Sequence, residues 1–252
     1  MSQLTRYQEY ALASIEAIVF DIDFTLVVPE DKTFYDDIGI HIQEYIMSTF
    51  SINEDQFNSI NNYYIGKNNW AEKVLLDKGN LTTICKLLGI DYSLINWQMY
   101  DRAFDYLRSH TENRTTDQYF VTNPQVVEML EHYKQSNIQI LALSNCPENL
   151  SRKVLQSTGI DPEYHFDIYH PWLNTHYSPP KVTHETKIFL ELAERVAKDP
   201  AKIISIGDNY SMDIYHANSA GYKTCYISPN TKPATFNCST VLDFYDLHRH
   251  FI

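Results

Sequence analysis

Residues 17–26 have the sequence AIVFDIDFTL and form the most informative stretch of this 252-residue chain. The first four residues are apolar without a break, which is typical of a parallel strand buried on both faces. This run ends at Asp21, and Asp23 follows two positions later. Side chains two apart on an extended chain point the same way, so the sequence predicts a buried strand that delivers two carboxylates together.

Further apolar runs alternate with helical patterns over the second half of the chain. We expect strands at residues 138–143, 166–169, 203–206 and 223–227. Helices are expected after the Asn123-Pro124 start signal, before Gly159, at 185–197, at 213–220 and in the tail at 243–252. Strands that alternate with helices indicate an α/β fold, in which helices cover both faces of a parallel sheet.

The pattern is different between the first strand and residue 109. Apolar residues recur there at helical spacing, and no alternation typical of strands stands out. We therefore predict an all-helical domain at residues 31–111, inserted into a core domain that comprises residues 1–30 and 112–252.

Composition sets the broad class of protein. An apolar fraction of 44% is that of an ordinary soluble globular chain. No apolar run is long enough to span a membrane and no secretory leader is visible, so a cytoplasmic location is expected. The four scattered cysteines lack a C-x-x-C spacing and are expected to be free thiols; they are Cys85, Cys146, Cys225 and Cys238.

The charge of the chain restricts its partners. The formal net charge is -12, and no stretch rich in lysine or arginine interrupts it. Binding a nucleic acid polymer requires a broad basic face, so that partner is excluded. A small phosphorylated metabolite is compatible, because one lysine, a metal ion and helix N-termini suffice to hold a single phosphate.

Polar residues follow the predicted strands at the edge where an open parallel sheet binds its ligands. Six candidate site residues come at or soon after strand ends: Asp21, Asp23, Ser144, Asn145, Asp208 and Asp213. A seventh, Lys181, precedes the start of a predicted helix. The carboxyl ends of parallel strands meet at one edge, so we expect these side chains to converge.

These residue types suit phosphoryl transfer. A carboxylate such as Asp21 can attack phosphorus and form an acyl phosphate. Asp23 can protonate the leaving oxygen and then activate the water that cleaves the intermediate. Clustered carboxylates repel a phosphate dianion unless a hard cation offsets them. Mg²⁺, bound by Asp21, the main-chain carbonyl of Asp23 and Asp208, is the cofactor that fits.

The phosphoryl group itself needs donors and a positive charge. Ser144 can donate a hydrogen bond to it, and Lys181 can neutralise the developing charge. Thr25 and Asn145 are included among the expected phosphate ligands. Lys187 competes with Lys181 for the role of the cation, but Lys181 is favoured because it precedes the start of a predicted helix.

The ordered motifs resemble those of the haloacid dehalogenase (HAD)-like superfamily. The resemblance rests on residues 20–26, Ser144-Asn145, Lys181, and Gly207-Asp208 followed by Asp213. It implies a Rossmann-like core, a helical cap domain inserted after the first motif, and Mg²⁺-dependent chemistry. It also implies a role for each residue: Asp21 as nucleophile, Asp23 as acid and base, Ser144 and Lys181 as phosphate ligands, Asp208 as metal ligand, and Asp213 behind the metal ligands.

Particular residues refine this resemblance. Superfamily members that displace halide lack an acid at the position of Asp23, so a phosphatase is favoured over a dehalogenase. Residues 61–64 are similar to pyrimidine 5'-nucleotidase-like members, which makes a nucleotide one candidate among small phosphate monoesters. Phe24 stands where the family often has a small or polar residue, and Val182 stands where a proline usually follows the lysine.

Other functions stay open at this point. One is a HAD-like binding or regulatory protein with little turnover. Phe24 and the Val182 that follows Lys181 depart from the family pattern and are compatible with this alternative. Others are phosphotransfer to another acceptor and a phosphatase that acts on a protein or another macromolecule. The sequence leaves the physiological substrate and the oligomeric state open.

Overall fold

The computed structural model describes residues 4–29, 44, 47–56, 89, 120, 122–172, 181 and 184–252. The predicted helical insertion at 31–111 lies almost wholly outside the described residues. The insertion and the domain boundaries therefore stay predictions, and so does the state of Cys85. The other three cysteines are free thiols, as expected.

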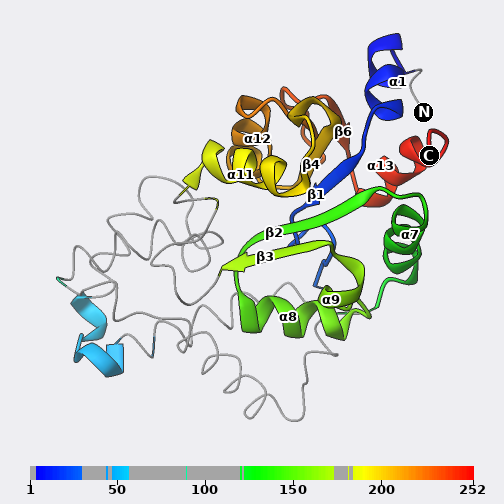
Figure 1. Ribbon diagram of the computed structural model, residues 1–252. Coiled ribbons are helices and arrows are strands. Elements are labelled where there is room, and N and C mark those ends of the chain that lie inside the picture. Colours follow the sequence, from blue (N-terminus) through cyan, green and yellow to red (C-terminus); the bar gives the residue numbers. More distant parts are fainter. Residues whose placement is uncertain are drawn as a thin grey trace.

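Six parallel strands form one sheet within the described part of the chain (Figure 1). Their order across the sheet is β3-β2-β1-β4-β5-β6, so the strand order reverses direction at β1. Their bounds are β1 Ala17–Phe20, β2 Gln139–Pro147, β3 Ile168–Trp172, β4 Ile203–Gly207, β5 Lys223–Ile227 and β6 Phe236–Cys238. The predicted α/β fold is confirmed, and a switch point of this kind is where open sheets bind ligands.

Helices cover both faces of the sheet (Figure 1). One face packs against α1 (Arg6–Ala13), α7 (Pro124–Gln135), α8 (Glu148–Ser157) and α13 (Val241–His248), and the other against α11 (Thr186–Val196) and α12 (His216–Ser219). Shorter elements are α9 (Pro162–His165), a 3₁₀ turn at Pro200–Lys202 and a π-helix at Tyr210–Tyr215. No helix among the described residues is long and apolar enough to cross a membrane.

Strand β1 lies at the centre of this arrangement. All four of its residues are buried, as the apolar run predicted. Ile18 and Phe20 belong to the core on the α7 side, whereas Ala17 and Val19 belong to the core on the α11 side. The strand is therefore covered on both faces, which explains why it contains no polar residue.

Local signals set several helix ends. Asn123 caps α7, since its Oδ1 accepts the Gln125 main-chain N–H at 3.1 Å, and Pro124 occupies the first turn. Gly159 follows α8 with a φ of +82°, a conformation that favours glycine. These two predictions are confirmed.

Other boundaries differ from the expectations. The strand expected at 166–169 begins at Ile168, and the helix expected at 213–220 begins as the π-helix at Tyr210. The tail helix is present but begins at Val241, because Thr240 and Asp243 form a reciprocal capping box there. Helix α1 and strand β6 were not expected. Both are short, and α1 buries only Ala11 and Leu12, so the apolar pattern is weak.

Candidate active site

Asp21 lies directly after β1, at the edge where the strands end (the carboxyl edge). Its main-chain N–H donates to the Ile206 carbonyl at 2.9 Å, so β4 fixes its position. The chain then turns back sharply, because the Ile22 carbonyl accepts the N–H groups of Thr25, Leu26 and Val27. The turn keeps Asp23, which is half-buried, on the same loop as the buried Asp21.

Asp213 reaches the carboxyl edge from the π-helix that follows β4. Asn209 starts this helix by accepting the main-chain N–H groups of Ser211 and Met212. The Asn209 main-chain N–H donates to Asp213 Oδ2 at 2.9 Å. A Cβ added to Gly207 would lie 2.3 Å from that same oxygen, so only glycine at 207 leaves room for the Asp213 carboxylate.

Lys181 joins the acids of β1 and the π-helix. Its buried Nζ lies 2.5 Å from Asp21 Oδ1 and 2.5 Å from Asp213 Oδ1. Its main-chain N–H donates to Asn145 Oδ1 at 3.0 Å, so the end of β2 holds the lysine in place. The competing candidate, Lys187, is exposed on α11 and pairs with Glu191 at 3.1 Å. The structure thus brings Lys181, and not Lys187, to the carboxylates.

Ser144 occupies the end of β2, where the pairing with β3 becomes irregular after Leu143. The residue is buried, and its Oγ accepts the Cys146 main-chain N–H at 2.9 Å. A hydroxyl that accepts one hydrogen bond can still donate its own hydrogen. Ser144 is therefore suited to hold a phosphoryl oxygen, whereas Asn145 uses its Oδ1 to orient Lys181.

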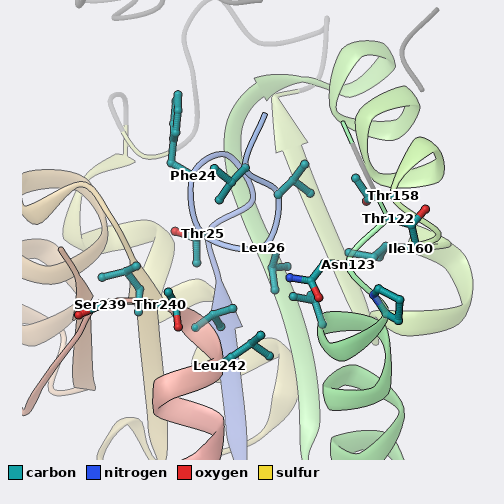
Figure 2. A pocket seen from close by; sticks show the side chains of 16 residues that line it. Phe24, Thr25, Leu26, Thr122, Asn123, Thr158, Ile160, Ser239, Thr240 and Leu242 are labelled. Carbon is teal, nitrogen blue, oxygen red and sulfur yellow. The ribbon is translucent and has the colours of Figure 1, made fainter. Parts of the chain in front are cut away.

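Thr25, one of the expected phosphate ligands, is buried in the loop that follows β1. It lines a cavity of about 390 Å³ together with residues at the starts of α7 and α13. Figure 2 shows this cavity, with Thr25 and Leu26 above Leu242 in the view. We call Asp21, Asp208, Asp213 and the lysine among them, Lys181, the acidic cluster. None of the described residues that line the cavity belongs to this cluster. Thr25 Oγ1 is buried without a hydrogen-bond partner among the described residues.

Burial and mutual repulsion weaken the acids of the acidic cluster. Burial, together with the neighbouring Asp21, raises the pKa of Asp208 to about 8. Burial raises the pKa of Asp213 to about 7 against the opposing effect of Lys181, and it raises the pKa of Asp21 in the same way. Burial alone would lower the pKa of Lys181, but Asp21 and Asp213 outweigh it and raise that pKa.

The acidic cluster fits a divalent cation. Carboxylate oxygens of Asp21, Asp208 and Asp213 lie within 4.8 Å of one another, and hard oxygen ligands of this kind suit Mg²⁺. When all are ionised, these carboxylates exceed the single Lys181 ammonium by two negative charges, which one divalent cation would balance. Asp213 has both oxygens engaged by Lys181 and Asn209. We therefore propose Asp208 and Asp21 as metal ligands, with Asp213 held in place beside them.

Two positioning residues, Gly207 and Asn209, were not among the sequence-based candidates. Gly207 admits the Asp213 carboxylate, and Asn209 both starts the π-helix and donates to that carboxylate. The Gly-Asp-Asn sequence directly after a buried strand was the available signal. Its meaning depends on how the chain folds back from residue 213, which spacing does not reveal.

The family of the chain follows from its sequence match. Residues 15–221 match the family model of haloacid dehalogenase-like hydrolases, so the chain belongs to this family. The resemblance inferred from the motifs is confirmed, because this range contains every motif on which it rests. A comparison with curated proteins gave no match.

Solved structures show the same fold at low identity. A HAD phosphatase from Thermococcus onnurineus has a TM-score of 0.58 and 19% identity, with 92% of this chain and 97% of that chain covered. A predicted phosphoglycolate phosphatase from Haemophilus somnus has a TM-score of 0.55 and 18% identity, with 93% and 98% covered. A 2-haloacid dehalogenase from Pseudomonas syringae has a TM-score of 0.54 and 13% identity, with 94% and 100% covered. Since different activities share this fold, the side chains of the site must decide the reaction.

Proposed function

We propose that this chain is an Mg²⁺-dependent phosphatase that hydrolyses a small phosphate monoester through a phosphoaspartate on Asp21. The observation that carries the proposal is the contact of Lys181 Nζ with both Asp21 and Asp213 at 2.5 Å. A buried carboxylate beside a fixed ammonium, with a metal-compatible set of acids around it, is suited to a phosphoryl group that carries negative charge.

The first chemical step in this proposal forms the intermediate. An oxygen of Asp21 attacks phosphorus, and the bond between phosphorus and the leaving oxygen breaks. The Asp23 carboxyl gives its proton to that oxygen, so an alcohol departs. Ser144 donates to a phosphoryl oxygen, and Lys181 balances the charge that develops.

The second step regenerates the enzyme. The Asp23 carboxylate takes a proton from water, whose oxygen attacks phosphorus and breaks its bond to Asp21. Inorganic phosphate then leaves. Mg²⁺, when bound by Asp21, Asp208 and the Asp23 carbonyl, would offset the charge of the phosphate and of the carboxylates.

Asp23 supports a phosphatase over a dehalogenase. Halide is a stable anion that departs without a proton, whereas an alkoxide leaving group requires one. An acid two residues after the nucleophile therefore serves ester hydrolysis and has no comparable use in halide displacement. A nucleoside monophosphate belongs to the substrate class that this mechanism admits.

The test is phosphate release from a panel of phosphate monoesters, with and without Mg²⁺, by the wild type and by Asp21→Asn. We expect Mg²⁺-dependent turnover that falls at least about 1,000-fold in the variant, since the nucleophile is lost. A phosphoenzyme trapped by rapid quenching should be present in the wild type and absent from Asp21→Asn. Wild-type protein that releases no phosphate from any ester would replace this proposal with a binding or regulatory role.

A further inference from the structure

Phe24 combines two unfavourable features at the carboxyl edge. Its φ is +59°, in the left-handed region that bulky residues rarely adopt. Its side chain is also 43% exposed. A single exposed apolar residue needs no explanation, but a strained and exposed aromatic residue in a loop that carries candidate catalytic acids suggests a role.

Hydrogen bonds within the turn explain the backbone conformation of Phe24. The Phe24 main-chain N–H donates to the Val27 carbonyl at 2.8 Å, and the Ile22 carbonyl accepts three N–H groups within the same turn. A bridge between Asp23 and Val27 closes it. Glycine would adopt this conformation without strain, so the turn requires no side chain at residue 24.

The position of the ring indicates what it could contact. Figure 2 shows Phe24 at one end of the cavity that it lines with Thr25, with its ring directed away from Leu26 and Leu242. Phe24 also directly follows Asp23. Since the Asp23 carboxyl must come within hydrogen-bond distance of the leaving oxygen, the group attached to that oxygen passes close to residue 24.

We propose that the Phe24 ring contacts the leaving group of the phosphate monoester and selects esters whose alcohol carries a flat, apolar group. This inference rests on the proposed phosphatase function and adds a substrate class to it. A planar aromatic group gains more than a flexible chain of similar size when it packs against an aromatic ring.

The experiment compares benzyl phosphate with n-heptyl phosphate. Their leaving alcohols have similar basicity and the same number of carbon atoms, so the two esters differ mainly in the ring. In Phe24→Ala and Phe24→Gly, kcat/KM for benzyl phosphate should fall about 3-fold to 10-fold through KM. For n-heptyl phosphate it should change less than about 2-fold, and Phe24→Tyr should retain the preference for benzyl phosphate.

The two truncations separate the ring from the backbone strain. Phe24→Ala keeps the strained conformation and Phe24→Gly relieves it, so a loss shared by both variants belongs to the ring. Weaker competitive inhibition by benzylphosphonate in both variants would support the proposal without relying on turnover.

Two results overturn the inference in distinguishable ways. Turnover of both esters with an unchanged benzyl-to-heptyl ratio in the truncations would contradict the role of Phe24 and leave the phosphatase proposal intact. Absence of Mg²⁺-dependent turnover in the wild type would remove the phosphatase and this inference together.

Discussion

The two edges of the sheet use buried polar groups in opposite ways. At the carboxyl edge, Asp21, Asp208 and Asp213 crowd around a single ammonium, and burial raises their pKa values. At the opposite edge, where the strands begin (the amino edge), His248 and Tyr133 pack among aromatic rings. The carboxyl edge keeps charges that destabilise the metal-free fold, whereas the amino edge holds the helices together.

The amino edge joins three helices through one cluster. His248 of α13 has its Nδ1 3.3 Å from the Tyr133 hydroxyl of α7, and the Tyr245 hydroxyl lies 2.9 Å from His132 Nδ1. The Tyr133 and Tyr245 rings meet edge to face at 5.5 Å. Burial lowers the pKa of His248 to about 4, although the Leu12 main chain of α1 opposes that shift. The buried His248 is therefore neutral near pH 7 and packs among aromatic rings.

The largest expected effect is at Asp208. Asp208→Asn should lower kcat about 1,000-fold, because a metal ligand is lost. The same change should raise the free energy of unfolding in EDTA by about 1 kcal/mol, since folding no longer has to raise the pKa of this acid to about 8. The measurements are steady-state kinetics with Mg²⁺ and urea unfolding with EDTA.

Asp246→Asn is the matched control for this prediction. Asp246 is half-buried near the end of α13 and pairs with Arg249 at 3.2 Å, a partly solvated ion pair whose loss should change stability by less than about 0.5 kcal/mol. If Asp208→Asn instead destabilises the protein in EDTA, the contrast between the two edges is wrong.

Alanine in place of glycine should reduce activity at the carboxyl edge and stability at the amino edge. In Gly207→Ala the new Cβ would meet Asp213 Oδ2 at 2.3 Å, which displaces that carboxylate and with it Lys181. We expect kcat to fall at least about 10-fold. Gly221→Ala, next to β5 at the amino edge, forces a φ of +90° on alanine and should lower stability by about 1 kcal/mol with kcat unchanged.

Kinetics and thermal unfolding of both alanine variants check this pair. Equal losses of activity in the two variants would mean that general destabilisation, and not the position of Asp213, explains the effect.

The amino edge should show a defined pH dependence through His248. Unfolded His248 gains a proton near pH 6.5 but the folded residue only near pH 4, so the unfolded state binds more protons between these values. The stabilisation is therefore complete above about pH 6.5 and lost as the pH falls to 4, amounting to roughly 3 kcal/mol. His248→Gln should flatten the free energy of unfolding over this window.

The exposed His250 provides the control for that measurement. Urea unfolding of His250→Gln between pH 4 and 7 measures the effect of replacing an exposed histidine nearby. An unchanged profile in His248→Gln would show that the histidine does not couple protonation to folding.

The smallest effect concerns backbone strain. Phe24→Gly should be about 1 kcal/mol more stable than Phe24→Ala, because alanine is strained at a positive φ. Ala197 ends α11 with a φ of +53°, and Ala197→Gly should give a similar gain. Thermal unfolding compares the variants. A gain for Ala197→Gly without a difference between Phe24→Gly and Phe24→Ala would contradict this prediction. It would mean that the loop of residues 21–28 changes conformation when the Phe24 ring is removed.

Much of the core fold was predictable from local patterns. The uninterrupted apolar run of β1 predicted a strand buried on both faces, and Asn123-Pro124 predicted the start of α7, because both signals act within a few residues. The π-helix was not predictable in this way. It depends on Asn209 bonding to Asp213 while Gly207 makes room, and this requires the strand and the helix to be docked already.

The sequence by itself determined which residues could carry chemistry and that they would meet at one edge, because parallel strands deliver their carboxyl ends together. Only the tertiary structure decided the pairings: Asn145 holds the Lys181 main chain across 36 positions, and Lys181 bridges Asp21 and Asp213. Likewise, it assigned Thr25 to the wall of a separate cavity. Such contacts join residues far apart in the chain, and their geometry is set by the packing of whole elements rather than by local spacing.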